Sequence, residues 1–391
     1  MERDALLRTF CQNLIQCPSL SGEEKQVAQL IVQTMKEQGF DEMIIDRYGS
    51  VVGTIRGKFP GKAILLDGHI DTVPITNQAQ WKHDPYGAKI ENNRMYGRGT
   101  SDMKASVASM ILAAAFFAQD THKEFSGSVS VSCTVHEECF EGVSSREVSQ
   151  RVHPDYVIIG EATTNTLKRG QRGRAEIVVE TIGKSCHSSN PQEGFNAVYP
   201  MLSIVEKIQQ LKKEHHPVLG EGILELTDIK SSPYPGSSVV PDFCKVTYDR
   251  RLLVGETEES VLAPIERILQ EVRQEYPTLI AQAYLAQGEA LCWTGETIKA
   301  KRFFPAWIVQ EDDELVTKAL TGLQKAGIEP KLSHFSFCTN GSHFCGEAHI
   351  PTIGFGPSRE ELAHVIDEYI ELDQLYASCR GFTALIAELL Q

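Results

Sequence analysis

Short apolar runs that end in Gly, Pro or a charged residue recur along this chain, and helix-length segments separate them. Four of the runs are KAILLDGHID at 62–71, SVSVSCTV at 128–135, YVIIGEA at 156–162 and IPTIGFGP at 350–357. Runs of this length and composition are typical of buried β-strands. Their alternation with helical segments predicts an α/β domain with a mostly parallel sheet and helices on both faces.

Two helices are expected before the first strand. The first carries Leu6, Leu7, Phe10 and Leu14 at helical spacing. The second has a hydrophobic face and follows the sequence Ser21-x-x-Glu24, which has the form of a capping box.

The pattern changes between about residue 172 and about residue 305. Strand-like runs at 174–183, 223–230, 242–252 and 278–287 alternate with amphipathic helical segments around 195–214 and 257–275 in the order β-α-β-β-α-β. This order predicts a four-stranded antiparallel sheet backed by two helices, a ferredoxin-like α+β module. We therefore expect one domain built from 1–171 plus 306–391, with the module 172–305 inserted into it.

Composition limits the classes of partner. The formal net charge of −14 over 391 residues argues against a nucleic-acid-binding surface, which needs a basic footprint. Ten scattered cysteines without a C-x-x-C pair suit reduced thiols in a cytoplasmic protein better than disulfides. The first residues lack the apolar core of a signal peptide, and no apolar run is long enough to span a membrane. We expect a cytoplasmic protein whose partners are small solutes.

Acidic residues and histidines gather where the predicted strands end. In an open α/β sheet, ligands bind at the carboxyl ends of the strands. The two residues of the pair His69-x-Asp71 point the same way in extended backbone, so one can bind a metal while the other orients it. The remaining candidates are Asp102 in GRGTSDMK, Glu137 and Glu138 in HEE, Glu161 in IIGEAT, and His364 near the end of the chain.

Each of these motifs alone is weak evidence for a metal site. GRGTSDMK lacks the order of a phosphate-binding loop, and a single glutamate after a strand is usually a solvated turn residue. Together, two histidines and several carboxylates supply what a pair of divalent ions requires.

The adjacent glutamates have a specific use in such a site. Neighbouring residues in extended backbone point to opposite sides, so Glu138 can bind a metal while Glu137 faces the cleft. A carboxylate placed there can act as general base for a water that attacks a carbonyl.

These strings, in this order, resemble the dinuclear-zinc hydrolase family of succinyl-diaminopimelate desuccinylase, acetylornithine deacetylase, aminoacylase and carboxypeptidase G. The resemblance covers essentially the whole chain. It implies that Asp102 bridges two metals, one also held by His69 and Glu161, the other by Glu138 and His364. It further implies that Glu137 is the base and that Asp71 orients His69.

The same resemblance gives the inserted module a role as lid and homodimerisation domain. In GKSCHSS, His187 matches a lid histidine that reaches the partner subunit's site. In TYDRRL, Arg251 is the better match to an arginine that holds a substrate carboxylate, with Arg250 as its rival.

Some substrate-side positions depart from the family pattern. The lid reads SSVVP with Ser238, where relatives often carry Asn, and CTNGSH supplies Thr339 and Asn340, where many carry Asp at the second position. RGQRGRAEI, DRRLLVGET and FPAWIVQEDDELVTKAL look most like a branch labelled as a selenium-metabolism hydrolase. Because of these departures the identity of the substrate is not predicted, whereas all the expected metal ligands are present.

The expected function is that of a metal-dependent hydrolase, which cleaves the amide bond of a small N-acyl or N-carbamoyl amino acid with a free carboxylate. A dipeptidase or carboxypeptidase is the alternative within the same chemistry, and a catalytically silent scaffold is the alternative outside it. Oxygen and nitrogen ligands favour zinc and also accept cobalt or manganese.

Overall fold

The computed structural model describes residues 2–329 and 331–391, and the chain divides into two compact units. The first unit runs to Gln171 and also contains Glu289–Ala300 and Trp307–Gln391. The second comprises Arg172–Gly288 and Lys301–Ala306. No helix in the described ranges is long and apolar enough to cross a membrane.

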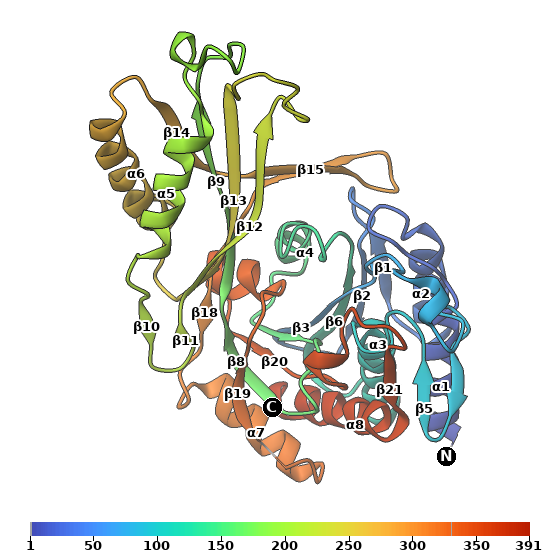
Figure 1. Cartoon of the computed structure of the whole chain (residues 1–391). Helices are drawn as coiled ribbons and strands as arrows, with labels where there is room; N and C mark the ends of the chain where they lie inside the picture. The colour runs from blue at the N-terminus through green and yellow to red at the C-terminus, as the bar shows by residue number, and fades with distance from the viewer. Residues whose placement is uncertain (1, 330) are drawn as a thin grey trace. The chain divides into compact units, whose positions relative to one another are not determined.

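The first unit is built on a mixed sheet, shown in Figure 1. Among the described residues it has nine strands, eight of them in the order β1-β2-β6-β3-β7-β20-β8-β18, with β19 beside β8. The central strands β6, β3, β7 and β20 are parallel, and antiparallel pairs flank them. The predicted mostly parallel central sheet is therefore confirmed. The strands are β1 (Glu42–Ile45), β2 (Val51–Arg56), β3 (Phe59–His69), β6 (Ser126–Thr134), β7 (Tyr156–Ile159), β8 (Leu167–Gln171), β18 (Trp307–Ile308), β19 (Leu332–Phe335) and β20 (Thr352–Gly354).

Helices cover both faces of this sheet. Along β3, Ile64 and Leu66 pack on one face into the main core, while Leu65 packs on the other face with Val148 and Phe344. The two-residue period of a strand explains this division. The helices are α1 (Glu2–Ile15), α2 (Lys25–Glu37), α3 (Lys104–Asp120), α4 (Ser145–Val152), α7 (Glu314–Lys325) and α8 (Leu372–Leu389), with short turns η1 (Gln78–Gln80), η3 (Ser342–Glu347) and η4 (Glu360–Leu362). A small sheet contains β4 (Lys89–Glu91), β5 (Arg94–Tyr96) and β21 (Tyr369–Glu371).

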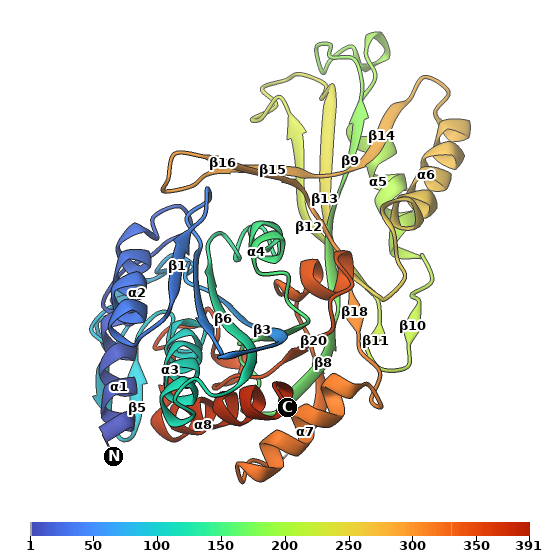
Figure 2. The ribbon, with the colours of Figure 1, turned by 180° about the vertical axis from the view of Figure 1, so that it is seen from behind.

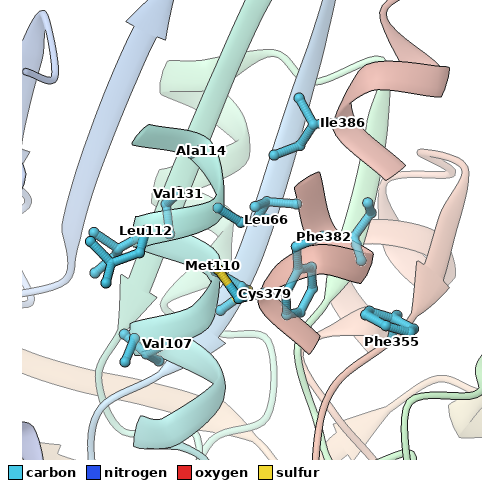
Figure 3. Packing of buried hydrophobic residues seen from close by; sticks show 14 of the residues in the cluster. Leu66, Val107, Met110, Leu112, Ala114, Val131, Phe355, Cys379, Phe382 and Ile386 are labelled. Atoms are coloured by element: carbon cyan, nitrogen blue, oxygen red, sulfur yellow. The ribbon is translucent and has the colours of Figure 1, made fainter. Parts of the chain in front are cut away.

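Helix α3 lies at the centre of the main core. Its residues from Lys104 to Ala118 are all buried, which explains why its sequence is apolar on every side. Figure 2 shows α1, α3 and α8 side by side. In Figure 3, Met110 of α3 lies near Phe382 and Cys379 of α8. This packing fixes the start of α3, the segment that follows Asp102.

The capping box expected before α2 is wrong. The helix begins at Lys25, and its N-cap residue Glu24 makes no capping hydrogen bond with its side chain. The Ser21 hydroxyl instead donates to the carboxylate of Asp71, 2.7 Å away, and Glu24 is fully buried and accepts from the Gly22 amide. The pattern marks a buried polar contact rather than a helix start.

The second unit has the predicted β-α-β-β-α-β order. Its main sheet runs β12-β13-β9-β14, all antiparallel, with the short β17 beside β9. Helices α5 and α6 pack on this sheet through one hydrophobic core. The elements are β9 (Gly173–Ile182), α5 (Val198–Gln209), β12 (Ile223–Ser232), β13 (Phe243–Leu252), α6 (Glu258–Glu275), β14 (Ile280–Leu285) and β17 (Phe303–Phe304), with η2 (Pro191–Glu193), β10 (His215–His216) and β11 (Gly220–Glu221) in its loops.

One hairpin, β15 (Gln287–Leu291) and β16 (Thr297–Lys301), lies mostly in a different unit from the one expected. The sequence pattern placed it in the inserted module, but residues Glu289–Ala300 group with the first unit. Side chains at its tip explain why, because Trp293 and Thr294 donate to the carbonyls of Gly49 and Arg47.

Candidate metal centre

Three neighbouring parallel strands deliver most of the candidate residues to one edge of the sheet. His69 is the last residue of β3, and the register places it opposite Thr134 of β6. Glu137 and Glu138 follow β6, and Glu161 follows β7. The prediction that these residues lie together at the carboxyl ends of the strands is therefore confirmed.

Asp102 and His364 reach the same place from loops. Asp102 stands just before α3, and its backbone N–H and that of Ser101 donate to the carboxylate of Glu368, at 3.2 and 2.7 Å. Glu368 is fully buried and also pairs with Arg98. His364 has a positive φ of 62° in the loop after η4. The Glu368 contacts thus fix the turn that presents Asp102.

Four side chains converge around Asp102. One of its oxygens, Oδ1, lies 2.9 Å from His69 Nε2, and the other, Oδ2, lies 3.1 Å from His364 Nε2. His364 Nε2 is also 3.0 Å from a Glu138 oxygen, and His69 Nε2 is 3.4 Å from Glu161. Asp102 therefore separates two histidine–carboxylate pairs, and each of its oxygens faces one of them.

Glu137 lies at the side of this cluster. Its Oε2 is 4.0 Å from His69 Nε2, and its Oε1 is buried without a hydrogen-bond partner among the described residues. The side chain is 8% exposed. Because Glu137 approaches only one histidine while Asp102 contacts both, Asp102 has the bridging geometry and Glu137 has a carboxylate oxygen free for another contact.

The acidic groups perturb one another strongly. Burial raises the pKa of Glu137 well above its usual range. Burial and the charge of Asp102 raise the pKa of Glu138 to about 7, and they also raise the pKa of Glu161. Hydrogen bonds to Asp102 and Glu138 raise the pKa of His364 to about 10. Four carboxyl groups packed around two histidines in this way favour the binding of a cation.

The donor set fits divalent metal ions. Potential ligand atoms of His69, Glu137 and Glu161 lie within 4.8 Å of one another, and so do those of His69, Asp102 and Glu138. Imidazole nitrogen with carboxylate oxygen is a ligand combination that zinc and similar ions accept. Both groups include His69, so the residues present can hold a divalent ion beside His69.

Asp71 makes different contacts from those expected. The Nδ1 atom of His69 lies 2.9 Å from the backbone carbonyl of Asp71 and 3.6 Å from its carboxylate. The carboxylate instead accepts hydrogen bonds from the backbone N–H groups of Glu137 and Glu138, at 3.0 and 3.2 Å, and from Ser21. Asp71 thus orients the His69 ring through its backbone and fastens the two-glutamate turn through its side chain.

Thr339 and Asn340, expected to contact substrate, are buried and bonded internally. Asn340 donates to Asp67 and Thr134, each at 2.9 Å, and accepts from the Gly142 amide at 2.8 Å. Thr339 donates to Gln171 at 2.6 Å. Both amide hydrogens of Asn340 are used, so its geometry supports a structural role and not a substrate contact.

His187, Ser238 and Arg251 belong to the second unit. His187 and Ser238 are exposed and lie on neighbouring segments, joined by the hydrogen bond from the Ser188 N–H to the Ser238 carbonyl. Asp249 contacts the Nε of Arg251 at 2.8 Å and so orients its guanidinium. Arg250 points to the opposite face of β13 and pairs with Glu256. Arg250 and Arg251, the two candidates for binding a substrate carboxylate, therefore lie on opposite faces of β13.

Sequence reasoning missed two residues that shape the site. Glu368 holds the Asp102 turn, and Ser21 holds Asp71. The first had a visible signal, because Glu368 stands four residues after His364 in an acidic segment. The second carried a misleading signal, since its spacing matched a helix cap.

Comparison with known proteins places the chain in a family. The model of Peptidase family M20/M25/M40 matches residues 65–388. A relative named "Uncharacterized protein YgeY", from Escherichia coli (strain K12), is 35% identical over 365 residues, which cover 92% of this chain and 88% of the relative. Succinyl-diaminopimelate desuccinylase 2 of Ruegeria sp. (strain TM1040) is 26% identical over 93% of this chain and 90% of the relative.

Solved structures share the fold. The YXEP protein of Bacillus subtilis, described as a dinuclear metal-binding peptidase of the M20 family, aligns with a TM-score of 0.73 and 15% identity over 99% of this chain and 98% of that one. The finer resemblance to the selenium-metabolism branch stays a prediction. The family match spans most of the chain and agrees with the clustered histidines and carboxylates, so this protein belongs to the peptidase family M20/M25/M40 and is a metal-dependent hydrolase of amide bonds.

Proposed function

We propose that the protein uses two divalent metal ions to hydrolyse a small N-acyl or N-carbamoyl amino acid, or a related small carboxylate. The observation that carries this proposal is the position of Asp102, whose two oxygens reach His69 and His364 separately. His69 and Glu161 would hold one ion, Glu138 and His364 would hold the other, and Asp102 would contribute a carboxylate oxygen to each. The first unit is then the catalytic domain and the second unit the lid.

The metals and the base have distinct tasks. Divalent ions bound to such a set polarise a carbonyl oxygen and lower the pKa of a water towards about 7. Glu137 takes the proton of the attacking water and delivers it to the leaving nitrogen. Its unpartnered Oε1 and its position beside His69 support this role. Asp71 holds the turn on which Glu137 and Glu138 stand.

The substrate side of the proposal rests on the second unit. Arg251, oriented by Asp249, binds the free carboxylate of the substrate, because a guanidinium can pair with a carboxylate through two parallel hydrogen bonds. His187 acts across a homodimer formed by the lid, with Ser238 beside it. The exposure of His187 and Ser238 supports an intermolecular role.

Zinc is the proposed metal, with cobalt or manganese as substitutes, since these ions share the imidazole and carboxylate ligands. The proposed location is the cytoplasm. The ten cysteines all lie in the described ranges and are free thiols, which agrees with a reducing compartment.

Adjacent variants test the division of labour between the two glutamates. Glu137→Gln should lose about 10² to 10⁴-fold in kcat, the usual contribution of a general base, and should keep both metals. Glu138→Gln is the matched control, and it should lose activity together with one metal by elemental analysis. Undiminished turnover of Glu137→Gln in the metal-loaded protein would refute the assignment of the base.

A hydrolysis screen tests the substrate class. The metal-loaded protein is offered N-acetyl, N-succinyl and N-carbamoyl amino acids, ureido acids and dipeptides, and the products are identified by mass spectrometry. Dipeptides belong in the screen because a peptide bond beside a free carboxylate presents the same two groups. Cleavage confined to dipeptides would contradict the proposed acyl or carbamoyl substrate while leaving the metal centre intact.

A further inference from the structure

The second unit contains a groove that has no part in the proposed hydrolysis. It lies between α5 and α6, the two helices that stand side by side in Figure 1, and the loops at one end of the sheet beneath them. Its volume is about 1170 Å³. Small-molecule sites usually occupy about 300 to 1,000 Å³, so the groove is large enough for such a ligand.

Apolar side chains from both helices and from the sheet form part of the groove wall. Ile208 of α5 and Val261 and Ile265 of α6 line it from the helices, and Leu224 and Leu226 of β12 line it from the sheet. All five belong to the hydrophobic core of the second unit or pack against it. The groove is thus an opening into that core between the helices.

The floor holds two polar groups that lack partners. Tyr248 and Arg250 stand two residues apart on β13, so both face the helices. The Tyr248 hydroxyl and the Arg250 Nε are buried without a hydrogen-bond partner among the described residues. Tyr248 is 3% exposed, and burial raises its pKa to about 12, so its hydroxyl remains a donor at neutral pH. Buried polar groups in native proteins are rarely left unpaired, so a ligand that reached this floor would supply the hydrogen-bond acceptors that these two groups lack.

The remaining atoms of the floor are held in place. Glu256 pairs with an outer nitrogen of Arg250 and accepts the backbone N–H of Leu253 at 2.7 Å. The Arg250 guanidinium therefore has a fixed orientation before any ligand arrives. Preorganised donors bind with a smaller entropic cost than mobile ones.

The rim of the groove adds positive charge. Lys212, Lys213 and Arg267 line it and are exposed, whereas Glu214 and Glu225 are the acidic residues there besides the paired Glu256. A local excess of cations is notable in a chain whose formal net charge is −14. Such a rim attracts anions.

We propose that this groove is a second ligand site, which binds a small organic anion with an apolar body. The carboxylate of the ligand accepts hydrogen bonds from the Tyr248 hydroxyl and the Arg250 Nε, and the apolar body packs between Ile208, Leu224 and Ile265. The ligand class follows from two donors at the floor, apolar walls and a cationic rim. The site is independent of the metal centre.

Octanoate is the probe for this proposal, measured by isothermal titration calorimetry. The wild-type chain should bind one octanoate per chain, and stripping the metals with a chelator should leave the affinity unchanged. Tyr248→Phe should bind octanoate at least tenfold more weakly. Because the hydroxyl has no hydrogen-bond partner in the part of the chain that the structure describes, this variant should melt at or above the wild-type temperature. Tyr199→Phe, an exposed position on α5 that does not line the groove, is the control and should bind normally.

Four results would overturn the proposal. The first is the absence of saturable binding to the wild-type chain, and the second is unchanged affinity in Tyr248→Phe. The third is binding that disappears on chelation, which would place octanoate at the metal centre. If binding vanished instead at concentrations where the chain dimerises, a second copy would cover the groove, and the ligand site would be rejected.

Discussion

A substitution of Asn340 tests whether this residue stabilises the fold or contacts the substrate, as its position in the sequence suggested. Asn340→Ala removes three buried hydrogen bonds at once, to Asp67, Thr134 and the Gly142 N–H. It leaves the Gly142 amide unpaired and the Asp67 carboxylate with one fewer donor.

The size of the effect follows from these contacts. A buried group left unsatisfied costs about 1 to 3 kcal/mol, and a hydrogen bond to a charged group contributes about 1.5 to 3 kcal/mol. Together they predict a loss of about 4 kcal/mol in the free energy of unfolding of the first unit. For a domain of this size that corresponds to a melting temperature lower by about 8 to 16 °C.

Differential scanning calorimetry measures the shift, and steady-state kinetics well below the transition measures KM. We expect a large fall in melting temperature and a KM within about twofold of wild type, since truncation should not touch bound substrate. Ser238→Ala is the control, because its exposed side chain should leave the melting temperature unchanged. An Asn340→Ala protein with wild-type stability and a KM raised tenfold or more would refute the reasoning.

Three further predictions concern the metal ligands, the dimer and a surface network. His364→Ala should retain one of two bound metals by elemental analysis, and retention of both would contradict its role as ligand. His187→Ala and Glu137→Ala, each inactive alone, should regain about a quarter of wild-type activity when mixed, because half the dimers are hybrids with one intact site; no recovery after demonstrated subunit exchange would argue against a shared site. Burial alone would raise the pKa of Glu347, but hydrogen bonds from His343 and Arg146 lower it to about 2. Its contribution to stability is therefore present above pH about 4.5 and lost as pH falls towards 2, so the melting temperature of Glu347→Gln should fall less than that of wild type between pH 5 and 3.

The sequence was sufficient for the parts of the site that depend on strand ends. His69, Glu138 and Glu161 each follow an apolar run, and parallel neighbouring strands bring such positions together whatever the loop details are. The order of elements in the second unit was equally visible, because both helices have a continuous apolar face. These features are local in sequence or follow from a general rule of topology.

Residues whose role depends on a distant partner could not be assigned in this way. Thr339 bonds to Gln171, 168 residues away, and Asn340 bonds to Asp67, 273 residues away. The family resemblance suggested substrate contact at these positions, and nothing nearby in the sequence indicated that both side chains would be buried. The hairpin that carries Trp293 was misplaced for the same reason, since the contact that positions it is with Gly49.

Asp71 shows how the two kinds of information combine in one residue. Its spacing from His69 is local, and the sequence correctly brought the pair together. Its carboxylate contacts the Glu137 amide, 66 residues away, and that contact exists because the parallel register of β3 and β6 places His69 opposite Thr134. The backbone of Asp71 therefore orients a proposed metal ligand, while its side chain fastens the turn that carries the proposed base. The same turn also carries Glu138, a proposed metal ligand. A substitution that removes the Asp71 carboxylate should therefore disturb metal binding and proton transfer together, whereas a substitution at Glu137 should disturb proton transfer alone.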